Sequence, residues 1–203
     1  EIGSGLVGSE MCIRDSYKRI LSLDSAMAVV QFKKDHVAYQ RNYFISYPAN
    51  VMVMRFSADQ PGKQNLVFSY APNPVSTGNM ASDSNKGLVY SASLDNNGMK
   101  YVVRIQAETK GGTLSNADGK LTVKGADEVV FYITADTDYK PNFDPDFKEP
   151  KTYVGVNPEE TTKEWMNNAV SQGYTALFSQ HYNDYAASVS YTHLRAHETG
   201  AYL

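Results

Sequence analysis

The chain has 203 residues, with 19 Lys and Arg against 22 Asp and Glu and a formal net charge of −3. This near balance excludes the strongly basic surface that nucleic-acid binding requires, and no apolar run approaches the length of a membrane span. The single cysteine, Cys12, excludes a disulfide within the chain.

The two ends of the chain are related at the level of DNA. Leu6 to Ser16, LVGSEMCIRDS, can be encoded by an oligonucleotide whose reverse complement encodes Ser188 to Glu198, SVSYTHLRAHE. This oligonucleotide closely resembles the transposase adapter used to build sequencing libraries. We therefore predict that residues 1–16 and 188–203 are adapter-derived and not native, and foreign segments of this kind are excluded from fold reasoning.

An apparent metal site falls within the second of these segments. His193 and His197 are four residues apart with Glu198 beside them, which on a helix is a plausible zinc arrangement. Because the adapter accounts for these residues, the sequence predicts no metal ligands and no cofactor site. Residues 17–187 remain, enough for one domain with a substantial core.

Residues 17–135 have the texture of an all-β protein, with short runs of Val, Ile, Tyr, Phe and Thr between Gly, Asn, Asp and Pro. Turn dipeptides such as Asp118-Gly119 favour hairpins, and residues 71–87 are a loop by composition. Hairpin spacing without helical periodicity indicates an antiparallel β-sandwich. Strands are predicted near residues 17–23, 26–33, 36–46, 50–58, 65–71, 87–94, 98–108, 119–124 and 127–134.

Residues 136–157 form a second predicted loop, because its three prolines preclude regular strand pairing. The acidic residues of this loop have two interpretations. A calcium-binding loop would use carboxylate oxygens, but the spacing lacks the Gly and the distal Glu of an EF-hand, which favours a solvated loop with local turns. The residues concerned are Asp136, Asp138, Asp144 and Asp146, with Asn142 between them.

Helical periodicity begins at Asn157, which can cap a helix, with Pro158 in the first turn and Glu160 three residues after the cap. Gly173 is a natural stop. A second helix is predicted to follow, with one apolar stripe of Tyr174, Leu177, Phe178, His181, Tyr182 and Tyr185. Because such a stripe must be buried against something, we expect its partner to lie in a continuation of the protein.

Four stretches together resemble glycoside hydrolase family 95, the α-L-fucosidases, in the order in which that family has them. Asn42 stands where the family usually has Glu, which puts any ion pair of that Glu in doubt. The matching residues are Tyr17, Arg19, Leu21, Leu23 and Ala26; Tyr39, Arg41, Phe44, Ser46 and Pro48; Ala135, Thr137 and Tyr139; and His181, Asp184 and Tyr185.

The resemblance implies a mainly β N-terminal domain of the super-sandwich type at 17–157, followed by a helical linker at 158–187. The parent enzyme would remove terminal α-linked fucose from glycans by inversion, without a cofactor. Its catalytic groups would lie in an (α/α)6 barrel outside this chain, so no catalytic residue is carried over. Family members are usually exported, which implies a periplasmic or extracellular location.

Two pairs of residues are the candidates for contact with substrate or with the missing barrel. Tyr139 and Tyr153 are loop tyrosines that could border a sugar site, although alternation in strands explains most aromatics as core. His181 and Asp184 lie close together on the second helix, where a structural role for His181 is favoured over a barrel contact. The rival function is a stand-alone carbohydrate-binding or adhesion module, and the uncovered stripe of the second helix argues against it.

Overall fold

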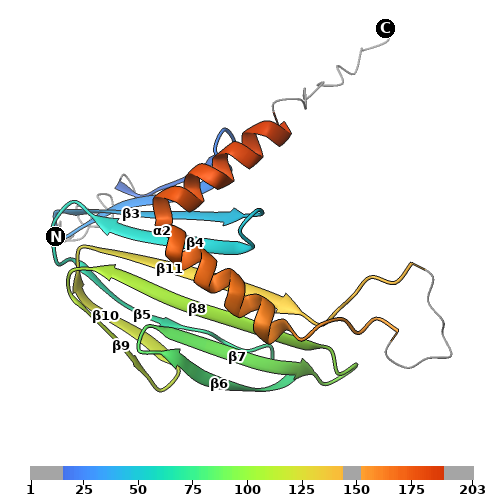
Figure 1. Ribbon diagram of the computed structural model, residues 1–203. Coiled ribbons are helices and arrows are strands. Elements are labelled where there is room, and N and C mark those ends of the chain that lie inside the picture. Colours follow the sequence, from blue (N-terminus) through green and yellow to red (C-terminus); the bar gives the residue numbers. More distant parts are fainter. Residues whose placement is uncertain (1–15, 144–151, 190–203) are drawn as a thin grey trace, which may run out of the picture.

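The computed structural model describes residues 16–143 and 152–189, so the predictions for 1–15, 144–151 and 190–203 lie outside the described residues. Two antiparallel sheets and one kinked helix make up the fold, which confirms a mainly β sandwich (Figure 1). The large sheet contains β1 Lys18–Ser22, β2 Met27–Lys34, β3 Val37–Ser46, β4 Val51–Ala58, β6 Ser76–Ser84, β7 Gly87–Leu94, β8 Lys100–Lys110 and β11 Glu128–Thr137. The small sheet contains β5 Gln64–Ser69, β9 Thr113–Ala117 and β10 Lys120–Ala126.

The strand order of the large sheet is β1-β2-β3-β4-β11-β8-β7-β6, and that of the small sheet is β5-β10-β9. The small sheet covers β11, β8 and β7, where Leu121 and Val123 of β10 join Leu88, Ile105 and Phe131 in one buried cluster. Alternation of side chains along each strand supplies this apolar inner face.

Helix α2, Pro158–Val189, covers the opposite face of the large sheet (Figure 1). Its Met166, Ala169 and Leu177 are buried in a second cluster with Phe44 and Val53. β11 therefore lies between the two clusters, with Phe131 in the first and Tyr132 in the second. Burial raises the pKa of the Tyr132 phenol, and the hydrogen bond that it donates to Glu108 at 2.9 Å raises it further.

The predicted break at Gly173 is confirmed. Its φ of 71° and ψ of 172° are not helical, and α2 consists of two helices joined at this kink. Glycine alone adopts this region readily, because it has no Cβ. The first part of α2 runs across β8 and β11, and the kink turns the second part toward β3 and β4 (Figure 1). The helix continues to Val189, two residues into the segment predicted to be adapter-derived.

Two strands were missed by the sequence analysis. The loop prediction for residues 71–87 is wrong, because β6 pairs with β7 along the edge of the large sheet. β9 was not predicted and pairs with β10. Both strands lie at sheet edges and are largely polar and exposed, so they lack the alternation by which strands are recognised.

The expectation that the stripe of the second helix lies uncovered is also wrong. Tyr174, Leu177, Phe178 and His181 pack against the β3 and β4 side of the large sheet, where Phe44 meets the rings of three of them. The chain thus buries most of this apolar face internally. No helical segment in the described part is long and apolar enough to cross a membrane.

Substituting Gly173→Ala is expected to destabilise the protein by about 1–2 kcal/mol, because a Cβ is strained at positive φ. No neighbouring atom lies within 4 Å of the position of the added Cβ, so backbone strain alone sets the cost. Urea unfolding measures the loss. The control Gln172→Ala, at an exposed helical position, should stay within about 0.5 kcal/mol of the parent chain. Equal stability of the two variants would contradict the strained kink.

Candidate interface and substrate-border sites

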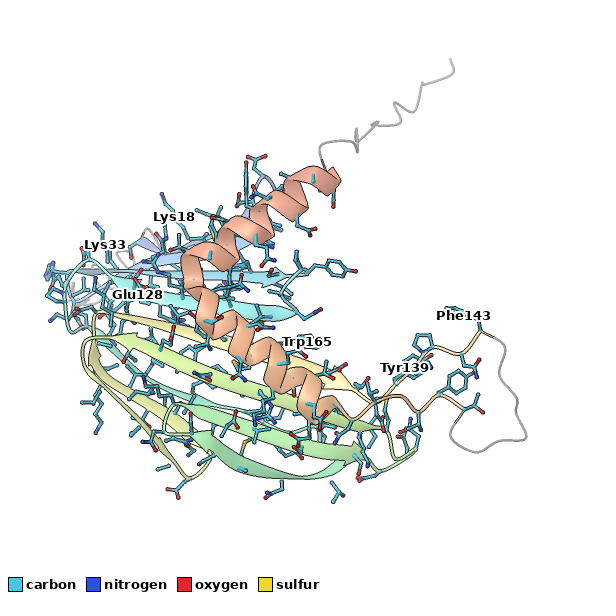
Figure 2. All side chains as sticks on the ribbon, viewed as in Figure 1. Lys18, Lys33, Glu128, Tyr139, Phe143 and Trp165 are labelled. Carbon is cyan, nitrogen blue, oxygen red and sulfur yellow. The ribbon has the colours of Figure 1, made fainter. Side chains whose placement is uncertain are left out.

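An aromatic arm, residues 138–143 and 152–157, projects from the end of the sandwich (Figure 2). Its two sides are joined at a bridge between Tyr139 and Val154, with Lys140 N donating to Tyr153 O at 2.7 Å. The rings of Tyr139 and Tyr153 stack with centroids 5.9 Å apart and planes 13° apart. The structure therefore brings together the two tyrosines that the sequence singled out.

The aromatic arm exposes an unusual number of large apolar side chains for a loop. Phe143 is 98% exposed, and Figure 2 shows it beyond Tyr139 on the outer part of the arm. At least half of the surface of Tyr139, Val154 and Val156 is also exposed. Phe143 was not among the predicted site residues, although a phenylalanine inside a proline-rich polar loop is a signal for an exposed contact residue. Large exposed apolar side chains that gather in one place mark contact surfaces.

The base of the arm is fixed to the sheet through Asp138. This residue is buried, its carboxylate accepts from Lys100 N at 2.9 Å, and its carbonyl accepts from Gly155 N at 2.6 Å. Asp136 accepts from Thr137 N at 2.8 Å. Both described aspartates of the loop therefore serve local hydrogen bonds, while Asp144 lies outside the described residues together with Asp146.

His181 and Asp184 lie on the second part of α2 and differ in exposure. His181 is buried, its Nε2 lies 3.0 Å from Ser25 O, and its ring stacks on Phe44 with centroids 5.0 Å apart. This histidine joins the helix to the β1–β2 turn. Asp184 is exposed one turn later, beside a hollow of about 450 Å³ that Tyr43 and other apolar side chains line at the end of β3.

Asn42, the position that departs from the resembled family, lies on β3 directly opposite Arg55 of β4. It accepts from Gln40 and donates to the Tyr174 hydroxyl at 3.2 Å. Arg55 forms an ion pair with Glu128, which raises the pKa of the guanidinium, and its Nε is buried without a hydrogen-bond partner. Glu128 thus provides Arg55 with a carboxylate. The Nε–H of Arg55, on the residue opposite Asn42, still lacks an acceptor.

A charged cluster that the sequence analysis missed anchors the start of α2. Arg104 on β8 is buried and pairs with Asp83 at 2.9 Å and with Glu159 at 2.6 Å. Its Nε donates to the Thr162 hydroxyl at 3.2 Å, and Ser91 donates to Glu159. The sequence signal for this cluster was an arginine at position 104, on the same face of β8 as the buried Val102. Glu159 is therefore an anchoring residue that ties the first turn of α2 to β7 and β8.

The described residues hold no group of three His, Cys, Asp or Glu side chains that could bind a metal ion. They do present contact surfaces, among them the stacked Tyr139 and Tyr153 of the arm and the exposed Phe143. The class that the fold defines is a two-sheet antiparallel β-sandwich domain with a helix on the outer face of its large sheet.

Comparison with known proteins places the chain within one family. The profile described as "Glycosyl hydrolase family 65, N-terminal domain" matches residues 9–142, and the chain belongs to this family. The expectation of a glycoside hydrolase N-terminal domain is thereby confirmed at this level. The matched range begins inside the segment 1–16 that the sequence predicts to be adapter-derived.

Two curated relatives cover most of the chain. It is 32% identical over 181 residues to "Probable alpha-fucosidase A" of Aspergillus niger, which covers 84% of this chain and 22% of that protein. It is 25% identical over 202 residues to "Alpha-L-fucosidase 2" of Arabidopsis thaliana, with the same two coverages. The chain thus spans about a fifth of the length of the curated relatives it matches.

The fold recurs among solved structures, of which one example is a phosphorylase. It is described as "Putative kojibiose phosphorylase from human microbiome", with a TM-score of 0.56, 8% sequence identity, and coverage of 85% of this chain and 25% of that chain. At this identity the match shows a common architecture and nothing about the substrate.

Substituting Asn42→Glu is expected to stabilise the chain by about 1 kcal/mol, which for a domain of this size raises Tm by about 2–4 °C. A carboxylate at this position can accept from Gln40, from the Tyr174 hydroxyl and from the unpartnered Nε of Arg55. Calorimetry at neutral pH measures the shift. The matched variant Asn42→Leu removes both existing hydrogen bonds and should lower Tm. A similar fall in Tm for Asn42→Glu would show that a carboxylate at position 42 does not accept from the Nε–H of Arg55.

Substituting Arg104→Met is expected to destabilise the chain by about 2 kcal/mol, because it leaves two carboxylates without their cation. The side chains of Asp83 and Glu159 are 32% and 38% exposed, so water solvates them in part and the loss stays below that of a fully buried pair. Urea unfolding measures the change. Lys163→Met, at an exposed position of the same helix, is the control, and a loss no larger than that of this control would contradict the anchoring role.

Proposed function

We propose that the chain is the non-catalytic N-terminal domain region of a glycoside hydrolase that removes terminal α-L-fucose, in the manner of glycoside hydrolase family 95. The observation that carries this proposal is the 32% identity to an alpha-fucosidase across 84% of the chain, combined with the chain's small share of that protein's length. In this proposal the reaction centre belongs to an (α/α)6 barrel, and the β-domain packs against it.

The aromatic arm supports a role at the border of the substrate entrance. Tyr139 and Tyr153 stack on each other, which holds each ring in place, and leaves their outer faces exposed to solvent. Aromatic faces and exposed aliphatic groups suit the apolar faces of sugar rings. Because Asp138 fixes the base of the arm to β8, the tyrosines are presented from a rigid support.

Export of the parent enzyme to a periplasmic or extracellular location is part of the same proposal. It is supported by the resemblance to a family whose members are usually exported and whose fucosylated substrates are glycans.

A stand-alone carbohydrate-binding or adhesion module is the second candidate. An uncovered stripe on the second helix would count against a stand-alone module, but Phe44 and the side chains around it cover that stripe. Because the domain buries the apolar face of its own helix, that face does not require a partner domain. The exposed tyrosines of the arm would then be its sugar-binding surface.

The first test is catalytic. The purified 203-residue chain is expected to release no nitrophenol from an aryl α-L-fucoside, because in this proposal the acid and the water-activating group belong to the barrel. Measurable turnover that survives a second purification step would refute the assignment of catalysis to another domain.

A glycan array distinguishes the two candidates. For an accessory domain we expect no glycan to be retained by the isolated chain, since the arm would border a site completed by the barrel. Binding of a glycan that is lost in Tyr139→Ala and Tyr153→Ala, but kept in Tyr182→Ala, would favour the stand-alone module. Tyr182 is a suitable control because it is 43% exposed on α2, outside the arm.

A further inference from the structure

The inner face of the large sheet is covered over only part of its width. One row of directly opposed residues crosses five neighbouring strands: Leu21, Ala28, Tyr43, Met54 and Phe131. Opposed residues of antiparallel strands share a face, so all five point to the side of the small sheet. Phe131 is fully buried, whereas Leu21 at the far end of the row is 68% exposed.

Coverage ends at strand β5. Phe68 of β5 stacks on Phe131 with ring centroids 4.7 Å apart. β5 is an edge strand of the small sheet, so the small sheet covers nothing beyond it. Between β5 and strands β2–β4 lies a hollow of about 510 Å³, lined by Phe32, Tyr39 and Phe56 on one side and by Leu66 on the other. Within the described part of the chain, β5 has a strand neighbour on one side only, so its other edge presents unpaired N–H and C=O groups.

The face beyond β5 has the composition of a core, not of a surface. By the same registers its members are largely apolar, and Ile45 is 66% exposed. The set comprises Val30, Phe32, Tyr39, Ile45, Met52 and Phe56. This open inner face continues directly from the buried cluster that the small sheet already covers, where Met54 and Phe56 are packed at its margin.

One cation lies in the middle of this open inner face. Arg41 is exposed, and its guanidinium sits over the rings of Phe32 and Phe56 at 5.0 and 5.4 Å from their centroids. The ion pairs found in the described residues involve Arg55 and Arg104 instead. An arginine held on an apolar face by two rings is placed for a carboxylate that approaches from the covering layer.

We propose that strands of the same longer polypeptide, outside these 203 residues, pair with the free edge of β5 and cover the open inner face. They would lay alternate apolar side chains on β2–β4 and place a carboxylate on Arg41. The inference rests on the proposed function only in taking the chain as part of a longer protein, as its 22% share of its relatives suggests. The continuous core and the open strand edge select a strand as the occupant.

The test is thiol labelling in two proteins, each with Cys12→Ser as background. One is the 203-residue chain, and the other is the longer protein obtained by reading the source DNA outward in the same frame. Ile45→Cys places a thiol on the open inner face, and Val75→Cys places one at a 58% exposed position just before β6, at the far edge of the large sheet. We expect the thiol at position 45 to react at least ten-fold more slowly in the longer protein, and the thiol at position 75 to react equally in both.

Three outcomes would overturn the proposal. Equal labelling at position 45 in the two proteins would mean that the longer polypeptide leaves the face open. Protection in the 203-residue chain that increases with its concentration would assign the face to a second copy. A reading frame with no further coding sequence would leave no occupant. Circular dichroism of each variant before labelling ensures that only folded protein is compared.

Arg41 provides an independent readout. Arg41→Gln is expected to lower Tm more in the longer protein than in the 203-residue chain, because only the former supplies the carboxylate. Equal shifts would remove the carboxylate from the proposal. Fucosidase activity of the longer protein is measured separately, so a protected but inactive protein would refute the proposed function and leave this inference standing, and an active but unprotected one would do the reverse.

Discussion

The structure depends on one strand that must be buried on both faces. β11 carries Val129 and Phe131 toward the small sheet and Val130 and Tyr132 toward α2, and all four are nearly inaccessible to water. A strand in this position cannot alternate between apolar and polar residues, and its run of Val, Val, Phe, Tyr and Ile meets that demand. The two hydrophobic clusters of the molecule meet at this strand, and neither can be repacked without affecting the other.

The polar contacts of α2 follow from this arrangement. An apolar helix face on an apolar sheet could slide, whereas buried charges and hydrogen bonds have one satisfied geometry. Arg104 fixes the start of the helix through Glu159, and His181 fixes its end through the carbonyl of Ser25. Gly173 then lets one helix serve two parts of a twisted sheet. Asn42 lies opposite Arg55, whose carboxylate partner is Glu128.

Most of the fold was predictable from local patterns. Strands with clear alternation, the turn at Asp118 and Gly119, and the helix break at Gly173 follow from period and backbone preference alone. β6 and β9 were not predictable in this way, since a polar strand at an edge has no buried face to reveal it. For the candidate site, the pattern identified Tyr139 and Tyr153 as loop tyrosines, but their stacking depends on backbone pairing across the arm. The covering of the second helix depends on contacts between residues more than a hundred positions apart, such as Asn42 and Tyr174.

The polar character of β6 has a consequence for assembly. Nearly all of its side chains are exposed and small or polar, and Asp83 near its end is held by Arg104. An edge of this kind offers little to an incoming strand. A fibre that grows by pairing the edge strands of neighbouring large sheets needs both edges of that sheet on each molecule. In this sandwich one of the two edges is β6, which pairs poorly. The polar β6 edge therefore directs any strand addition away from this side of the large sheet.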